Sequence, residues 1–128
     1  MTRQELRVYL ADWFCGCGHP EHACAALLRL LRLQPLYNNR AEIDAWLPDD
    51  GVQHLLLYKL SADDLTEHGG SVGGGWLTDK GRDVQAALAV EEADGFEALT
   101  ESACVHGFAE VDGQPYWDHD CMRADAAA

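Results

Sequence analysis

The sequence has no long hydrophobic run, and its first residues do not have the pattern of an export signal. No apolar stretch approaches the roughly 20 residues that a membrane-spanning helix needs. The first 14 residues, MTRQELRVYLADWF, contain Glu5 and Asp12 and lack a continuous apolar region followed by a small-residue cleavage site. We therefore expect a cytoplasmic protein without membrane contact, whose five cysteines are thiols or metal ligands rather than a disulfide framework.

Basic residues are scarce and unevenly distributed. The chain holds 9 lysines and arginines against 22 acidic residues, which gives a formal net charge of −13. Residues 1–40 carry five arginines and three acids, a balance of +2, whereas residues 41–128 carry four basic and 19 acidic residues, a balance of −15. A surface this negative repels nucleic-acid phosphates and attracts basic partners. We therefore expect a basic protein as the partner, and no nucleic acid.

What is present is the composition of an ordinary folded protein. The hydrophobic fraction of 48% and the charged fraction of 24% are typical of a globular chain. A chain of 128 residues is long enough to bury a core, and no internal repeat or linker divides it. Residues 1–128 are therefore expected to form a single domain.

Capping signals and apolar periodicity predict a mostly helical chain. The expected helices begin at Thr2 with Glu5, at Pro20, at Asn39 and at Thr78. Between the last two lies VQHLLLYKL, which is apolar nearly all round and predicts a buried central helix. It is followed by LTEHGGSVGGGWLT, whose apolar ends and glycine-rich middle predict a β-hairpin with a long tip.

The segment LTEHGGSVGGGWLTDKGRDVQAAL, residues 65–88, resembles the wing and following helix of winged-helix proteins. In that family a short hairpin returns into LT-x-K-G-R and a helix. The segment is also similar to small uncharacterised proteins of actinobacteria and their phages. The resemblance implies a winged-helix-like fold for the helical part, residues 1–94. Together with the helix signals and an Asp112–Gly113 turn signal, it leads us to expect an α+β, mainly helical fold in which residues 95–128 form a C-terminal β-hairpin extension and tail.

The same resemblance implies DNA binding through the helix before the wing, and the sequence departs from the family there. VQHLLLYKL offers only His54 and Lys59 as basic donors for DNA, and the wing contains no arginine or lysine. We therefore expect that the usual DNA-reading surface is lost or repurposed.

Residues 13–24, WFCGCGHPEHAC, hold three cysteines and two histidines. The spacing Cys15-x-Cys17 is tighter than that of a zinc knuckle and is not the C-x-x-C of a redox pair. Cys24 falls about one turn inside the second helix, where a small buried side chain is the plain expectation. We therefore expect a structural turn here, with a metal site and redox chemistry as the alternatives.

The C-terminal segment predicts a metal site more specifically. If Asp112–Gly113 forms a hairpin turn, Val111 faces Gln114 and the same register continues outward. The outer cross-strand pairs are then Phe108 with Trp117, His106 with His119, and Cys104 with Cys121. These side chains share one face, with opposed Cβ atoms about 5 Å apart.

Cys104, His106, His119 and Cys121 thus form a candidate Cys₂His₂ zinc set. Such a zinc would be structural, because four protein ligands leave no open coordination position. In the simpler alternative, the aromatic pair packs on the core and the cysteines and histidines are half-buried neighbours. A Cys104–Cys121 disulfide is a further alternative, and Pro115 weakens the expected strand.

No other motif carries catalytic chemistry. GGSVGGGWL lacks the Lys-Ser/Thr of a phosphate-binding loop, and His68 has no nucleophile in a recognisable elbow. The acidic pairs Asp63–Asp64 and Glu91–Glu92 are expected to be solvated. The N-terminal arginines are expected to neutralise acids of later helices rather than to bind an anionic partner; they are Arg3, Arg7, Arg29, Arg32 and Arg40.

We therefore expect a non-catalytic, intracellular acidic binding protein that acts through protein–protein contacts. A phage-type regulator or inhibitor fits this expectation, including an acidic mimic of DNA. The alternatives are a winged-helix DNA-binding transcription regulator and a small zinc- or thiol-dependent enzyme.

Overall fold

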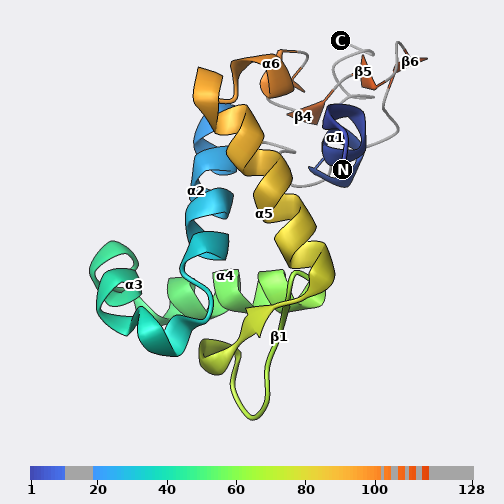
Figure 1. Ribbon diagram of the computed structural model, residues 1–128. Helices are drawn as coiled ribbons and strands as arrows, with labels where there is room; N and C mark the ends of the chain where they lie inside the picture. Colours follow the sequence, from blue (N-terminus) through green and yellow to red (C-terminus); the bar gives the residue numbers. More distant parts are fainter. Residues whose placement is uncertain (11–18, 102, 105–106, 109, 112–113, 116–128) are drawn as a thin grey trace, which may run out of the picture. The chain divides into compact units, whose positions relative to one another are not determined.

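The computed structural model describes residues 1–10, 19–101, 103–104, 107–108, 110–111 and 114–115 (Figure 1). In these residues the protein is mainly helical, with short two-stranded antiparallel sheets. The chain divides into two compact units, residues 1–27 with 87–128, and residues 28–86. The single domain over residues 1–128 stays a prediction. Within the described part of the chain, no helix is long and apolar enough to cross a membrane.

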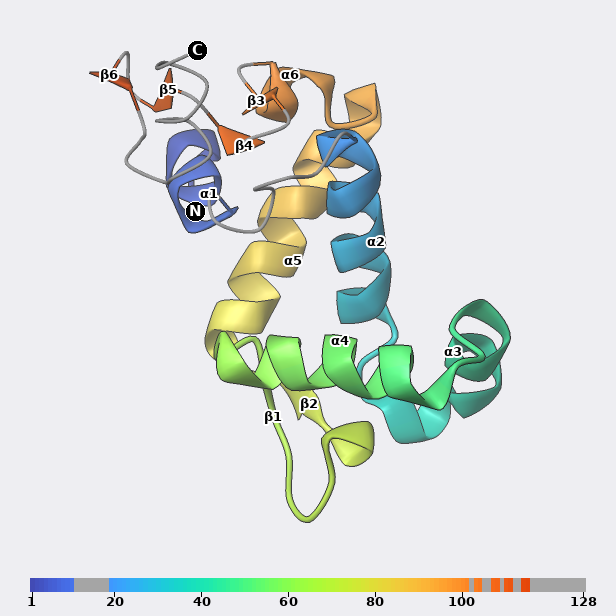
Figure 2. The same cartoon turned by 180° about the vertical axis from the view of Figure 1, so that it is seen from behind.

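The helices are labelled in Figure 1, and the view from behind in Figure 2 shows α4 without obstruction. The α-helices are α1 (Arg3–Leu10), α2 (Pro20–Arg32), α3 (Arg40–Trp46), α4 (Asp50–Ala62), α5 (Asp79–Glu91) and α6 (Glu97–Thr100). The 3-10 turns are η2 (Leu36–Asn38), η3 (Val72–Gly74) and η4 (Glu92–Asp94). The strands are β1 (Thr66–Glu67), β2 (Trp76–Leu77), β3 (Ala103–Cys104), β4 (Gly107–Phe108), β5 (Glu110–Val111) and β6 (Gln114–Pro115).

The unit formed by residues 28–86 contains the end of α2, then α3, α4, the β1–β2 hairpin and the start of α5. Its fully buried side chains are aliphatic: Leu28, Leu31, Leu36, Ile43, Leu60, Leu65 and Val84. The expected hairpin is confirmed, because β1 and β2 pair antiparallel through Thr66↔Leu77 and Glu67↔Trp76. Both views show the hairpin next to α4 (Figures 1 and 2).

Thr78 joins this hairpin to α5. Its hydroxyl accepts a hydrogen bond from the Gly81 amide at 2.9 Å, which confirms the expected cap. The same hydroxyl donates to the Asp64 carbonyl at 2.5 Å, and the Thr78 amide donates to the Leu65 carbonyl at 3.0 Å. The cap therefore also fixes where β2 returns to the end of α4.

The other unit contains α1, the start of α2, the end of α5 and α6. The cap expected at its N-terminus is present in part: the Glu5 amide donates to the Thr2 hydroxyl at 3.1 Å, and this hydroxyl donates to the Glu5 carboxylate at 3.2 Å. The buried side chains include Leu6, Leu10, Cys24, Leu27, Leu88, Phe96 and Leu99. Gly95 adopts a left-handed conformation at φ 67° and ends the helical stretch after η4, as glycine at this position predicts.

The expected C-terminal hairpin is wrong in its long form. The pairs next to Asp112–Gly113 are found, because Val111 pairs with Gln114 and Glu110 with Pro115. Cys104, however, pairs with Gly107 and Ala103 with Phe108. Because β3 pairs antiparallel with β4, Cys104 and Phe108 do not lie on one continuous strand, and Cys104 does not have the predicted register. The expected partners Trp117, His119 and Cys121 lie outside the described residues.

Candidate functional site

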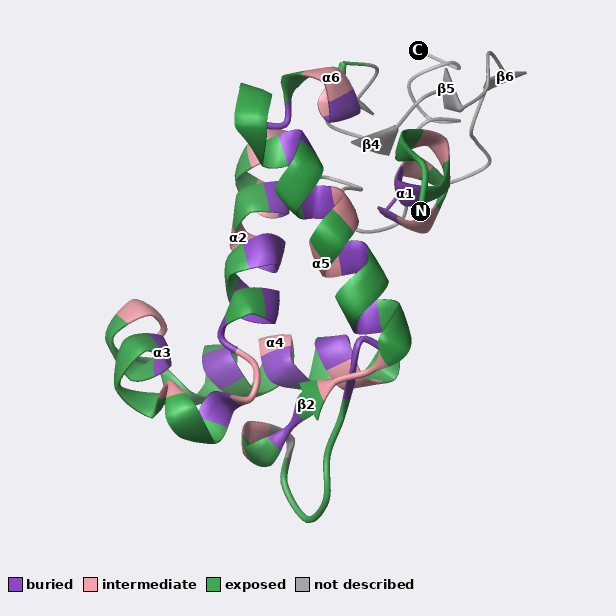
Figure 3. Ribbon diagram, viewed as in Figure 1, coloured by how far each residue is buried: buried purple, intermediate pink, exposed green. Residues whose placement is uncertain are grey.

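Helix α4 carries apolar side chains on two opposite sides, and this is the feature that sequence reasoning did not anticipate. Its buried side is formed by Gln53, Leu57 and Leu60. Residues three apart on a helix lie close together on the surface, so positions 52, 55 and 58 form a separate row. Figure 3 shows both buried and exposed residues along this helix. The expectation of a helix buried all round is therefore wrong.

The exposed row consists of Val52, Leu55 and Tyr58, and we call these three residues the α4 face. Their exposed fractions are 48%, 68% and 60%, respectively. The row extends over about 9 Å at 1.5 Å per residue. Large apolar side chains that share one side of a helix and remain exposed are typical of a surface that binds another protein.

Acidic residues lie at both ends of helix α4. Asp49 caps the helix, its carboxylate accepting a hydrogen bond from the Val52 amide at 2.9 Å, and Asp50 follows in the first turn. Asp63 and Asp64 follow the last turn, and Lys59 forms an ion pair with Asp63 at 3.2 Å. The segment 49–64 therefore carries four acidic residues and one lysine.

The buried polar residue Gln53 holds the start of α4 against α3. Its side-chain oxygen accepts from Arg40 Nη2 at 2.9 Å. Its amide nitrogen donates to Asp44 Oδ1 at 3.0 Å and to the Leu47 carbonyl at 3.1 Å. Arg40 also pairs with Asp44 at 3.0 Å, so the four groups form one network. Buried polar groups with all partners satisfied fix the relative position of neighbouring elements.

A small polar pocket adjoins this network on the side of α4 that faces the hairpin tip. Its volume is about 210 Å³, and it is lined by Arg40, Asp50, Gln53, His54, Leu57, Ser71 and Gly73. The pocket contains both a cationic and an anionic side chain, and the Arg40 guanidinium in it is already bound to Asp44 and Gln53. It therefore has no single charge that would select one class of ligand.

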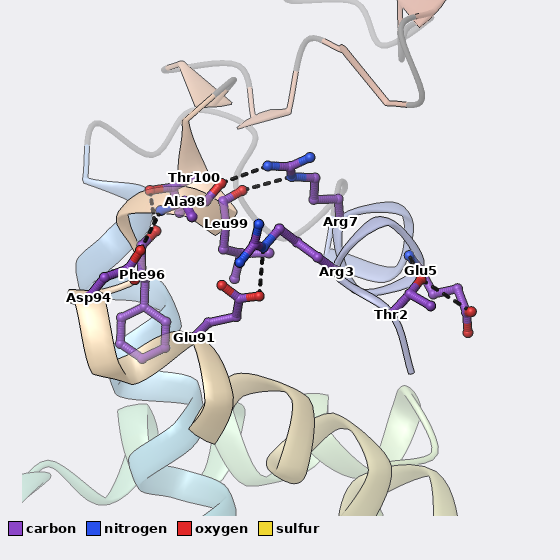
Figure 4. Close-up of polar contacts among 10 residues, drawn as sticks. All are labelled: Thr2, Arg3, Glu5, Arg7, Glu91, Asp94, Phe96, Ala98, Leu99 and Thr100. Carbon is purple, nitrogen blue, oxygen red and sulfur yellow. Dashed lines mark hydrogen bonds and ion pairs between the residues drawn. The ribbon is translucent and has the colours of Figure 1, made fainter.

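Of the N-terminal arginines, Arg3 neutralises an acid of a later helix, as the sequence predicts, whereas Arg7 binds backbone carbonyls. Arg3 pairs with the buried Glu91 at 2.8 Å, and Arg7 donates to the carbonyls of Ala98 and Leu99 at 2.6 and 3.0 Å (Figure 4). Elsewhere in the chain, the Arg29 guanidinium lies 4.2 Å from the centre of the ring of Trp46.

The contact with Glu91 raises the pKa of Arg3 above its ordinary value, first through the hydrogen bond and then through the opposite charge. A cation whose pKa is raised by folding stabilises the folded state at every pH below its ordinary pKa. This contribution is lost only in strongly alkaline solution, as the pH rises through the raised pKa. The contact therefore does not act as a switch near neutral pH.

The candidate zinc set falls mostly outside the described residues. Cys104 is in β3, and its pairing with Gly107 differs from the expected pairing with Cys121. His106, His119 and Cys121 lie outside the described residues, and so does the alternative Cys104–Cys121 disulfide. Zinc binding by these four residues stays a prediction.

The cysteine- and histidine-rich segment at residues 13–24 is described only in part. Cys15 and Cys17 lie outside the described residues, whereas Cys24 is fully buried in α2, as expected. The rings of His19 and His22 stack with centroids 5.0 Å apart. Among the described residues, no group of three or more histidine, cysteine or acidic side chains is arranged to hold a metal ion.

Comparison with known proteins adds no relative. No protein-family model, no curated protein and no solved structure matches the chain. The resemblance of residues 65–88 to a wing therefore depends on the segment itself.

Proposed function

We propose that the protein is a non-catalytic, intracellular acidic binding protein that acts through protein–protein contacts, as a regulator or inhibitor of its partner. The observation that carries this proposal is the α4 face, where Val52, Leu55 and Tyr58 are exposed together. Burying these three side chains against a partner would remove apolar surface from water, which is the main driving force of association.

The charge distribution supports a protein partner over a nucleic acid. The chain carries a net charge of −13, and residues 68–75 at the hairpin tip contain no arginine or lysine. The one lysine of α4, Lys59, is paired with Asp63. A phosphate backbone would meet repulsion at this surface, whereas a basic protein groove would be attracted to it. An inhibitor that mimics the charge of DNA is a special case of this proposal.

The order of elements supports a winged-helix-like interpretation of residues 20–91. Three helices, α2, α3 and α4, precede the β1–β2 hairpin, and α5 follows it. In this interpretation α4 has the position of a recognition helix, and its exposed residues are apolar rather than basic. The same hairpin favours the second candidate function, a winged-helix DNA-binding transcription regulator.

Affinity capture with matched variants tests the proposal. The full-length protein would be immobilised as wild type, as the double variant Leu55→Ser/Tyr58→Ser, and as Val90→Ser. Val90 is the matched control because it is an apolar side chain 74% exposed on α5, outside the α4 face. We expect the wild type and Val90→Ser to capture the same discrete protein from a lysate of the host cells, and the double variant not to capture it.

Fluorescence anisotropy with labelled duplex DNA, measured over a range of salt concentrations, separates the two candidate functions. We expect no binding at physiological salt, because the surface repels phosphate. A complex with duplex DNA that tightens as salt is lowered would instead support the transcription regulator. Such a complex, together with capture unchanged in the double variant, would overturn the proposed function.

A further inference from the structure

We propose that the α4 face binds a basic amphipathic helix of a partner protein. This inference rests on the proposed function and names the chemistry of the partner segment. Two independent features carry it, namely the apolar row in the middle of α4 and the acidic residues at both of its ends.

The apolar row sets the shape of the partner segment. Val52, Leu55 and Tyr58 are spaced three residues apart, so their side chains form a ridge along the helix. Ridges of this kind pack between the side chains of a second helix that presents apolar residues at positions i, i+3, i+4 and i+7. A second helix also satisfies its own backbone hydrogen bonds, which an extended segment lying on a convex helix surface cannot do.

The acidic ends set the charge of the partner segment. Asp49 and Asp50 lie at the start of α4, and Asp63 and Asp64 lie at its end, about 20 Å further along the axis at 1.5 Å per residue. Lysines or arginines at the two ends of a partner helix would lie near Asp49 and Asp64 while its apolar residues cover the row. Asp50 is on the pocket side of α4 and acts only at longer range. The charge of Lys59, four residues after Leu55, is offset by Asp63. Complementary charge at the rim of an interface accelerates association and selects the partner.

The same charges disfavour the other occupants of such a face. A second copy of this chain also carries a net charge of −13 and would be repelled. An anionic lipid surface and a nucleic acid meet the same repulsion. The apolar row and its acidic rim therefore fit a cationic amphipathic helix better than any of these.

A model peptide tests this inference directly. The probe is a 14-residue amphipathic helix of leucine and lysine, with leucines at positions i, i+3, i+4 and i+7, labelled for fluorescence anisotropy. Two control peptides are needed: the same composition with the leucines scattered around the helix, and a leucine–glutamate helix. We expect the full-length protein to bind the leucine–lysine helix, and to bind both controls at least about tenfold more weakly.

Variants of the protein show whether the peptide binds at the α4 face. Leu55→Ser/Tyr58→Ser is expected to weaken peptide binding about tenfold, whereas the exposed control Val90→Ser leaves it unchanged. Asp49→Asn/Asp50→Asn/Asp64→Asn removes three charges and keeps the cap and the left-handed residue Asp64, since asparagine suits both positions. We expect this triple variant to bind about threefold more weakly at low salt.

Charge removed elsewhere serves as the matched control. Glu42→Gln/Glu97→Gln/Glu101→Gln removes the same number of charges from exposed positions outside α4. It should leave peptide binding within the error of the measurement. Equal weakening by the two triple variants would overturn the inference, because attraction would then come from net charge alone.

The remaining outcomes separate this inference from the proposed function. If the α4 variants lose a captured protein but the leucine–lysine helix does not bind the wild type, the inference fails and the proposed function stands. If analytical ultracentrifugation finds a dimer that Leu55→Ser/Tyr58→Ser abolishes, a second copy occupies the face and the inference is overturned. If neither capture nor peptide binding depends on the α4 face, both fail.

Discussion

Gly81 is the position where the chain leaves least room for a side chain. A Cβ atom at this residue would lie 2.0 Å from the carbonyl oxygen of Leu65, which is also the acceptor for the Thr78 amide. Backbone cannot move aside as a flexible side chain can, so the clash displaces the start of α5 or the end of α4. The close approach of the Leu65 carbonyl thus explains why the LT-x-K-G-R segment has glycine at position 81.

Gly81→Ala is expected to destabilise the protein by about 3 kcal/mol, because the clash exceeds the roughly 1 kcal/mol that alanine gains over glycine in a helix. Unfolding in guanidinium chloride, followed by circular dichroism, measures the change. Gly74→Ala is the control, because no atom lies within 4 Å of its added Cβ. Equal stability of the two variants would contradict the steric explanation.

Gln53 is the polar residue on which the corner between α3 and α4 depends. Gln53→Met keeps the size of the side chain and removes its three hydrogen bonds. We expect a loss of about 2 kcal/mol, because Asp44 and the Leu47 carbonyl lose a donor and Arg40 loses an acceptor. His54→Ala, at the exposed neighbouring position, should change the free energy of unfolding by less than about 0.5 kcal/mol.

Local signals in the sequence predicted where individual helices begin. They did not predict which side chains form hydrogen bonds with residues distant along the chain. Thr2 and Thr78 cap their helices as expected, since a cap needs only the next three residues. Asn39 precedes α3 but makes no side-chain cap. Its side-chain amide instead donates to the carbonyls of Leu33 and Pro35. The roles of Asn39 and Gln53 depend on residues brought near by folding, and no local pattern contains that information.

Among the helices, the position of α4 in the sequence was predicted correctly, but its predicted burial was wrong. A helix that is apolar on all sides indicates burial when its neighbours are unknown. In the structure only one side, with Leu57 and Leu60, is buried. In a sequence, an apolar residue that packs in the core cannot be distinguished from an apolar residue that binds a partner. The sequence alone therefore could not separate the α4 face from the core.

The two sides of α4 should therefore respond differently to the same change. Leu60→Ser is expected to cost about 3 kcal/mol, because Leu60 is fully buried and the change leaves a cavity and an unpaired hydroxyl. Leu55→Ser is expected to cost less than about 1 kcal/mol, mainly through lower helix propensity, because Leu55 is 68% exposed. Urea unfolding of both variants checks this, and a comparable loss in the two would mean that Leu55 belongs to the core.

For the protein as a whole, the excess of acidic groups should weaken the folded state at low ionic strength. A net charge of −13 on 128 residues repels itself, and salt screens that repulsion. We expect Tm to rise by about 4 °C between 50 mM and 500 mM sodium chloride, if screening relieves on the order of 1 kcal/mol.

Differential scanning calorimetry measures this shift. Glu42→Gln/Glu97→Gln/Glu101→Gln should show a smaller dependence on salt, because it carries three fewer charges. A Tm that falls as salt is added would show instead that ion pairs such as Arg40–Asp44 outweigh the repulsion.

The C-terminal segment shows how far register can be predicted from one turn signal. Asp112–Gly113 correctly predicted the adjacent pair Val111↔Gln114. The same register predicted nothing correctly at Cys104, because the chain reverses again before Gly107. Each hairpin turn fixes only its nearest pairs, and a second reversal overrides everything beyond it.

The separation of the two sides of α4 has a practical consequence for how this protein can change. Positions 52, 55 and 58 can be randomised together while positions 53, 57 and 60 are held constant, so new specificities can be selected on an unaltered scaffold. The same holds for natural substitutions: changes at these three positions can alter which partner is bound without any compensating change in the core.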